Sequence, residues 1–284
     1  MSGVSELINA ELKAKYNPEG SVIRQSQQAA LEILIEFDRI CRKNGLKYYL
    51  EFGTLLGAVR HGGFIPWDDD IDVAMPPQDY KLFQQIAPQE MDGNFLLQNE
   101  ITEPESGMGG GMFKIRKKNT LWINDYDDFR RNYNKGISID VFENEDYPNV
   151  PKSVVRFFRR RLSKAFGFYH YFNRVSSKNA IAYFVFPVSW LLFRSIWKLI
   201  CLLCKCGKEQ PHIERLMFSN PSLKTDIYPL SEITFECHSF YAPKNPDARL
   251  RDIFGDYMKL PPENQRQIHA KFICTDLSKC HYNP

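Results

Sequence analysis

Four aspartates occupy five positions between a tryptophan and an apolar run in the segment WDDDIDVAM, residues 67–75. The apolar run is typical of a buried strand, yet carboxylates this close together repel one another unless a cation neutralises them. Side chains two positions apart along a strand share a face. We therefore expect Asp68, Asp70 and Asp72 to point to one face of a strand and Ile71 to point into the core.

This spacing of hard oxygen ligands suits Mg²⁺ or Mn²⁺ better than zinc. A further carboxylate, Asp140, stands between Ile139 and Val141 in GISIDVF. On an adjacent strand it would complete a triad with Asp70 and Asp72, which we predict to be the metal ligands. Such a triad holds one or two divalent ions for in-line phosphoryl transfer. The alternative, a calcium-stabilised loop or a solvated acidic turn, is disfavoured by the buried-strand residues around the acids.

Helical and strand-like segments alternate through the first half of the chain. Residues 21–45 form an amphipathic pattern with Ser21 as N-cap and Gly45 at its end, which predicts a helix. This mixture predicts an α/β or α+β fold, a mixed sheet of four to six strands flanked by helices. The expected strands lie in 47–52, 71–75, 94–99, 112–118 and 136–142, and further helices in 54–60, capped by Thr54, and in 78–87.

The stretch 152–208 contains twelve lysines and arginines and no acid, although the whole chain has a net charge of only +3. Its longest uncharged apolar run, 180–193, is too short to span a bilayer. Two interpretations remain open: a helix in the membrane interface with Trp190 and Trp197 at headgroup depth, or a helical subdomain whose aromatic residues pack on the core. Nucleic-acid binding is disfavoured, because the stretch is strongly aliphatic and contains no nucleic-acid-binding motif.

We predict three parts: a catalytic core in 1–150, a basic and aromatic helical insertion in 151–210, and a C-terminal part in 211–284 that packs back on the core. No signal-peptide pattern precedes the first helix, so we expect a cytoplasmic protein, peripheral on the membrane if the insertion binds lipid. Seven cysteines, three of them in CLLCKC, favour reduced thiols over a disulfide framework or a zinc cluster.

The segment FGTLLGAVRHGGFIPWDDDIDVAM, residues 52–75, resembles the signature of the LicD family, which includes bacterial phosphocholine transferases and is related to fukutin-type ribitol-phosphate transferases. Three later blocks resemble those of the family in the same order: FKIRKKNT (113–120), GISIDVF (136–142) and FGDYMKLPP (254–262). The resemblance extends from the first helix to residue 146 and over the last fifty residues, and it is weakest in the basic stretch. It implies a nucleotidyltransferase-like fold.

In that fold a Gly-Ser or Gly-Thr turn, matched here by Gly53 and Thr54, starts a helix whose N-terminus faces phosphate. A helix N-terminus beside a glycine is also a natural anion site on physical grounds. The resemblance further implies that an Asp-x-Asp pair and a third acid, here the predicted triad, bind metal. Asp68 exceeds the general pattern and is a second candidate for the metal face or for a general base. Asp69 is expected to point the opposite way, as a structural hydrogen-bond acceptor.

Two pairs of basic residues and a glycine loop are further candidates for donor binding. Arg60 and His61 follow the phosphate-facing helix and can bind a diphosphate or protonate a leaving group, with loop stabilisation as the alternative. Lys114 and Arg116 share a face of their strand and can present two cations to a nucleotide phosphate. The loop GMGGGM, residues 107–112, is flexible enough for a lid but lacks the Lys-Ser or Lys-Thr of a P-loop.

The residues and the resemblance together predict a metal-dependent transferase that moves phosphocholine or an alditol phosphate to a sugar of a cell-surface glycan or glycolipid, as in lipopolysaccharide or capsule biosynthesis. The CDP-activated donor, the release of CMP and the glycan acceptor are implied by the resemblance alone. The rival is a nucleotidyltransferase that transfers NMP with the same triad. A non-catalytic membrane-associated scaffold is disfavoured, because a dead site has no reason to keep mutually repelling acids. The C-terminal block with Asp256, Tyr257 and His269 is expected to pack on the body.

Overall fold

The computed structural model describes residues 5–106, 111–125, 127, 129–146, 150–170, 180–204, 211–214 and 222–280. These residues form two compact units. The first combines the residues up to Glu143 with those from Asp226 onward, and the second runs from Asn144 to Thr225. The compact units therefore divide the chain at 144 and 226.

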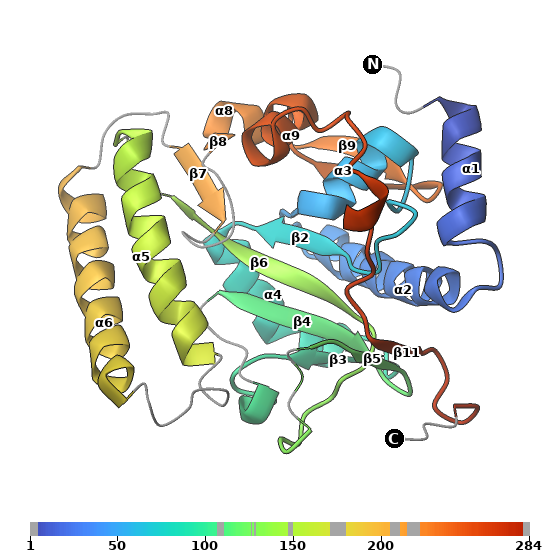
Figure 1. Cartoon of the computed structure of the whole chain (residues 1–284), viewed down its shortest axis with the longest axis horizontal. Helices are drawn as coiled ribbons and strands as arrows, with labels where there is room; N and C mark the ends of the chain where they lie inside the picture. Colours follow the sequence, from blue (N-terminus) through green and yellow to red (C-terminus); the bar gives the residue numbers. More distant parts are fainter. Residues whose placement is uncertain are drawn as a thin grey trace. The chain divides into compact units, whose positions relative to one another are not determined.

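A mixed sheet lies at the centre of the first unit, with strand order β1-β2-β6-β4-β3 (Figure 1). Strands β2 and β6 pair in parallel, while the other neighbours pair antiparallel. The mixed sheet with helices around it confirms the predicted fold class. The strands are β1 (Tyr49–Leu50), β2 (Asp72–Met75), β3 (Phe95–Gln98), β4 (Met112–Lys117) and β6 (Ser138–Asp146).

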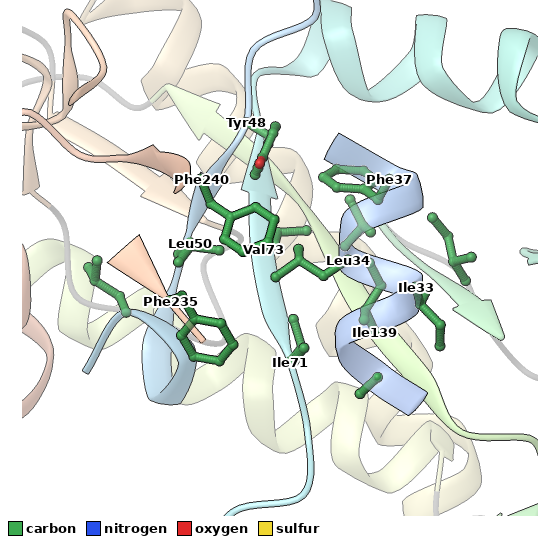
Figure 2. Packing of buried hydrophobic residues seen from close by; sticks show 14 of the residues in the cluster. Ile33, Leu34, Phe37, Tyr48, Leu50, Ile71, Val73, Ile139, Phe235 and Phe240 are labelled. Carbon is green, nitrogen blue, oxygen red and sulfur yellow. The ribbon is translucent and has the colours of Figure 1, made fainter. Parts of the chain in front are cut away.

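Helix α2 (Val22–Lys43) packs its apolar face on this sheet. The hydroxyl of its N-cap, Ser21, accepts a hydrogen bond from the backbone N–H of Arg24 at 3.3 Å, as the sequence predicts. Figure 2 shows side chains of α2 beside those of β6, of β2 and of Ile71, which directly precedes β2. Their fully buried side chains are Ile33, Leu34, Phe37, Ile71, Val73 and Ile139. Burial of one such side chain contributes about 1.5–3 kcal/mol. One face of β2 and β6 is thus committed to the core, which leaves their other face for the acids.

The remaining elements of the first unit come from both ends of the chain. Phe235 and Phe240, from the hairpin of β9 and β10, enter the same core (Figure 2). Strand β11 pairs antiparallel with β5. The elements are α1 (Glu6–Tyr16), α3 (Phe52–His61), α4 (Pro77–Glu90), η1 (Pro104–Ser106), β5 (Leu121–Ile123), β9 (Ser231–Phe235), β10 (His238–Ala242), α9 (Pro246–Phe254), η4 (Glu263–Gln265) and β11 (Phe272–Cys274), with α8 (Lys224–Ile227) at the start of the returning chain.

One disulfide joins Cys274 to Cys280, a pair that the cysteine pattern did not indicate. The two residues are close in sequence, and β11 brings them together where the chain turns. Within CLLCKC, Cys201 and Cys204 form no disulfide, and Cys206 lies outside the described residues.

The second unit is built on a helical hairpin of α5 (Lys152–His170) and α6 (Ala180–Leu203). Its small core contains Trp197, only 4% exposed, against Phe158 of α5. Trp197 therefore does not lie at headgroup depth, because it points toward α5. None of the helices in the described part of the chain combines the length and apolar character needed to cross a membrane. Short strands β7 (Pro211–Glu214) and β8 (Ser222–Leu223) pair with each other, and β7 also pairs with the end of β6.

Candidate active site

Two of the predicted acids lie side by side on neighbouring strands. Asp72 is the first residue of β2 and is in register with Asp140 on β6, as predicted. In-register residues of adjacent strands project from the same face of the sheet. Because β2 begins at Asp72, Asp68 and Asp70 lie in the preceding loop. The prediction of three acids alternating along one strand is therefore wrong, since the strand begins only where pairing with β1 and β6 begins.

Lys114 neutralises the third acid in this structure. It is the register partner of Asp140 on β4, and its Nζ lies 2.5 and 2.8 Å from the two Asp140 carboxylate oxygens. The side chains of Lys114 and Asp140 are 13% and 20% exposed. The sequence predicted Lys114 as a donor-binding residue, whereas here its charge is directed at the predicted metal ligand.

Arg116 shares the strand but does not present its charge outward. Its guanidinium donates hydrogen bonds to Gln98 Oε1, at 2.6 Å, and to the carbonyl of Gly136, and the residue is 3% exposed. Strand β4 lies between β3 and β6 and is therefore an inner strand of the sheet. A pair of cations that both face solvent would instead be expected on an exposed strand. Of the glycine loop, residues 107–110 lie outside the described residues.

Asp69 is a structural acceptor, as expected, but it does not point away from Asp68 and Asp70, because carboxylate oxygens of all three lie near His269 Nδ1. Its fully enclosed carboxylate accepts hydrogen bonds from Trp122 Nε1 at 2.8 Å and from the backbone N–H groups of His269 and Ala270 at 2.9 and 3.0 Å. A buried carboxylate with three N–H donors has most of its hydrogen-bonding capacity satisfied. Asp69 thus fixes the segment around His269 to the loop of aspartates, 200 residues earlier in the chain.

His269 is a site residue that the sequence analysis assigned to packing. Its Nδ1 lies 3.6, 3.5 and 3.3 Å from carboxylate oxygens of Asp68, Asp69 and Asp70, and its side chain is 60% exposed. Hydrogen bonds with Asp69 and Asp70 raise the pKa of His269 to about 11, so the imidazole is a cation in this arrangement. No sequence signal identified it, because it stands in a loop without ligand spacing.

The pKa values of Asp68 and Asp70 are shifted in opposite directions. Burial, and then the neighbouring Asp70, raise the pKa of Asp68 well above its usual range. Burial also opposes the ionised form of Asp70, but the hydrogen bond and charge of His269 hold the pKa of Asp70 below its usual range. Five carboxyl groups lie in the loop of aspartates and at Asp72 and Asp140, and within the described part of the chain the structure pairs them with two cationic side chains, Lys114 and His269. A set of carboxylate oxygens with unneutralised charge fits Mg²⁺ or Mn²⁺.

The residues whose possible metal-ligand atoms lie close together are not those of the predicted triad. Among the described residues, a possible ligand group within 4.8 Å comprises atoms of Asp68, Asp69 and His269. Because Asp69 already accepts three N–H bonds, we regard Asp68 as the member of this group best able to join Asp70, Asp72 and Asp140 around a cation.

Gly53 and Thr54 hold the start of α3 against the acids, although not as predicted. The helix begins at Phe52, so Thr54 is not its cap; instead its hydroxyl accepts a hydrogen bond from the N–H of Asp72 at 2.8 Å. A Cβ on Gly53 would lie 2.7 Å from Asp68 Oδ2, so the glycine permits the close approach of a carboxylate. Phe52 adopts φ 43°, a strained conformation of the kind found at functional sites.

A buried ion pair, missed from the sequence, precedes this helix. Glu51 Oε1 accepts hydrogen bonds from Nε (2.8 Å) and Nη2 of Arg249 on α9. The side chains are 0% and 1% exposed. Since the partners are 198 residues apart in the chain, the pair ties the start of α3 to the C-terminal part.

Arg60 and His61 are occupied by protein partners, which favours the loop-stabilising alternative. Arg60 donates from Nε to His61 Nε2 at 2.9 Å and from Nη1 to the carbonyl of Tyr257 at 2.8 Å. The other ring nitrogen of His61 lies 2.8 Å from Asn9 Oδ1. Burial, with the charge of Arg60, lowers the pKa of His61 to about 3. A neutral imidazole with both nitrogens engaged is not a proton donor to a leaving group near pH 7.

Residues 45–200 match the family model described as LicD/FKTN/FKRP, nucleotidyltransferase domain. This match covers more than half of the chain. The chain belongs to this LicD family. The family resemblance drawn from the sequence is thereby confirmed, and the chain is an enzyme, a LicD-type phosphotransferase.

Relatives extend over different shares of the chain. The chain is 28% identical over 260 residues to the lipopolysaccharide cholinephosphotransferase LicD of Haemophilus influenzae, a match over 87% of this chain and 95% of that protein. It is 48% identical over 42 residues to the ribitol 5-phosphate transferase FKRP of Homo sapiens, over 15% of this chain and 8% of that protein. Mannosyltransferase regulator 4 of Saccharomyces cerevisiae is 29% identical over 102 residues, 36% of this chain and 8% of that protein.

Proposed function

We propose that this LicD-type enzyme transfers phosphocholine, or a similar alcohol or alditol phosphate, from a CDP-activated donor to a sugar of a cell-surface glycan or glycolipid. The observation that carries the proposal is the pair of in-register carboxylates, Asp72 and Asp140, with Asp68 and Asp70 in the loop that enters β2. The names of its relatives, a cholinephosphotransferase and a ribitol 5-phosphate transferase, support the class of donor.

We propose that Asp70, Asp72 and Asp140, with Asp68 as a further ligand, hold Mg²⁺ or Mn²⁺. The fit rests on their hard oxygen donors and on the close approach of Asp70 to Asp68, which adds to burial in raising the pKa of Asp68. A cation there would neutralise phosphate oxygens and favour in-line attack at phosphorus. To release Asp140 to the cation, Lys114 must leave that carboxylate, and its ammonium is then free to pair with a phosphate oxygen of the donor.

The chemistry assigned to the chain itself is positioning and proton transfer. The acceptor hydroxyl oxygen bonds to the phosphorus of the transferred alcohol phosphate, the bond from that phosphorus to the bridging oxygen breaks, and CMP departs with the electron pair. We assign the Asp68 carboxylate oxygen that does not bind the cation as the base that takes the hydroxyl proton, since burial and the neighbouring Asp70 raise the pKa of this carboxyl group. The N-terminus of α3, whose first turn contacts Asp68 through Gly53, contributes the positive end of a helix dipole at the same place.

The proposed acceptor determines where in the cell the enzyme meets its substrate. A lipid-linked glycan would be met at a membrane surface, so we propose a peripheral position on the cytoplasmic face. This part of the proposal depends on the acceptor and can fail while the transfer chemistry stands.

Product analysis tests the proposal directly. The enzyme is incubated with Mg²⁺, a set of glycan acceptors and, in turn, CDP-choline, CDP-ribitol, CDP-glycerol or CTP, and the phosphorus-containing products are resolved by ³¹P NMR. We expect CMP and a phosphodiester-linked acceptor from one CDP-alcohol. Pyrophosphate from CTP with a nucleotidylated acceptor would instead establish the rival nucleotidyltransferase.

Matched variants separate a failed assay from a failed mechanism. Asp72→Asn should lower CMP release by at least about 100-fold, because a metal-held phosphoryl transfer loses most of its charge stabilisation. Glu11→Gln removes an exposed acid on α1 and should leave CMP release unchanged. Equal activity of Asp72→Asn and the wild type would exclude the assigned role of Asp72.

A further inference from the structure

Helix α6 is apolar on two opposite faces, and in the part of the chain that the structure describes only one of them is packed. The packed face contributes Trp190, Phe193, Trp197 and Cys201 to the small core shared with α5. The opposite face, here called the outer face of α6, carries large apolar side chains that are 52% to 74% exposed: Val188, Leu191, Leu192, Leu199, Leu202 and Leu203. The second unit therefore leaves a helical stripe of apolar surface uncovered in the structure.

The outer face is too regular to be incidental exposure. Single exposed apolar residues are common on protein surfaces. Here six of them fall within sixteen residues, at separations that place them on one side of a helix, with the short side chain of Ser195 between them. Keeping such a stripe in water forfeits about 25 cal/mol for each Å² of apolar surface that could be buried. The stripe is therefore a surface that favours an apolar partner.

The charge beside the outer face identifies the kind of partner. Arg194 and Lys198 are exposed on α6 next to the stripe, and Arg156, Arg160 and Arg161 are exposed on α5. The sequence from residue 152 to residue 208 contains no acid, so the hairpin itself offers these residues no acidic partner. A partner must then present both an apolar layer and negative charge. A bilayer surface that contains anionic lipid presents both. A second copy of this hairpin would bring the same positive charge and be repelled.

We propose that the outer face of α6 inserts into the interfacial layer of an anionic bilayer, with the helix parallel to the membrane surface. Arg194 and Lys198 of α6 then pair with lipid phosphates at the rim of the inserted stripe, and the arginines of α5 add positive charge to the same unit. The contact is made by leucine and valine side chains, whereas Trp197 stays in the hairpin core. This inference rests on the second unit alone and holds whether or not the proposed transfer reaction is correct.

Co-sedimentation of the full chain with vesicles tests the inference. Vesicles of phosphatidylcholine alone are compared with vesicles that also contain phosphatidylglycerol, at low and high salt. Leu191→Gln/Leu199→Gln removes apolar contacts from the outer face. Leu7→Gln/Ile101→Gln is the matched control, because these side chains are 79% and 81% exposed in the first unit.

We expect the wild type and the control to bind phosphatidylglycerol vesicles equally, more weakly at high salt, and Leu191→Gln/Leu199→Gln to lose at least about ten-fold in partition coefficient. Arg194→Gln/Lys198→Gln should lose about 25-fold, since each basic residue near an anionic surface contributes about five-fold. Thermal unfolding midpoints should be unchanged, because the replaced side chains are exposed.

Equal vesicle binding by the wild type and Leu191→Gln/Leu199→Gln would overturn the proposal, as would absence of wild-type binding. Sedimentation velocity distinguishes the other occupant: a wild-type dimer that dissociates in Leu191→Gln/Leu199→Gln, together with no vesicle binding, would show that the outer face joins two copies of the chain.

Discussion

Replacing Asp69 by Asn should loosen the C-terminal segment from the loop of aspartates. The Asp69 carboxylate accepts N–H bonds from Trp122 through Oδ2, from Ala270 through Oδ2 and from His269 through Oδ1. Asparagine offers one oxygen. If that oxygen keeps the bonds to Trp122 and Ala270, the new NH₂ group faces the N–H of His269, so one bond is lost and two donors oppose each other.

The cost follows from the bonds lost. A hydrogen bond to a buried charged acceptor contributes about 1.5–3 kcal/mol, and an unsatisfied buried donor adds to the loss. We expect Asp69→Asn to lower the free energy of unfolding by about 2–4 kcal/mol, measured by urea denaturation followed by circular dichroism. Hydrogen exchange of the amides of His269 and Ala270 should accelerate in the same variant.

Lys271→Gln, in the same C-terminal segment, is the matched control. It removes an exposed ion pair with Asp125, at 3.4 Å with both side chains 63% exposed. Exposed pairs contribute about 0–1 kcal/mol, so this variant should be nearly as stable as the wild type. A cost below about 0.5 kcal/mol for Asp69→Asn, with unchanged amide exchange, would refute the reasoning that Asp69 anchors the segment.

Three further predictions concern the surroundings of α3. Arg249→Met strands the buried Glu51 carboxylate and should cost about 3–5 kcal/mol in chemical denaturation, with much of the loss recovered by adding Glu51→Gln; no recovery would contradict the ion-pair account. Gly53→Ala places a Cβ against Asp68 and should cost about 1–3 kcal/mol and reduce CMP release, whereas wild-type activity would mean that the carboxylate moves freely. In the folded protein the pKa of His61 is lowered to about 3 from 6.5, so the stability that its neutral imidazole contributes is full above pH 6.5 and is lost as pH falls. Between pH 7 and pH 5, urea denaturation in EDTA should show that the free energy of unfolding of His61→Gln falls by about 2 kcal/mol less than that of the wild type. Equal losses in the two proteins would refute the buried neutral imidazole.

Features encoded in local sequence could be predicted. The start of α2 follows from Ser21 and an apolar period of 3.6, and both are found. The common face of Asp72 and Asp140 follows from the apolar residues that flank each of them, whereas the pairing of their strands was only supposed and is found in the structure.

Features that depend on distant parts of the chain could not be predicted. Arg249 and Glu51 meet through folding of the C-terminal part, and nothing near either residue indicates the other. His269 reaches the aspartates because the backbone N–H groups of His269 and Ala270 bind Asp69. This contact depends on how the fold of the whole chain positions the loop that contains His269. Helix α6 is apolar on two opposite faces, so its sequence alone could not decide that Trp197 faces inward.

The central claim is that carboxylates on β2 and β6 hold a divalent cation for phosphoryl transfer. Mn²⁺ binding, followed by electron paramagnetic resonance in the presence of CDP-choline, tests it most directly in the wild type, Asp72→Asn, Asp140→Asn and the control Glu11→Gln. The account predicts that both aspartate variants bind Mn²⁺ at least about ten-fold more weakly than the wild type and the control. Equal Mn²⁺ affinity in all four proteins would contradict it.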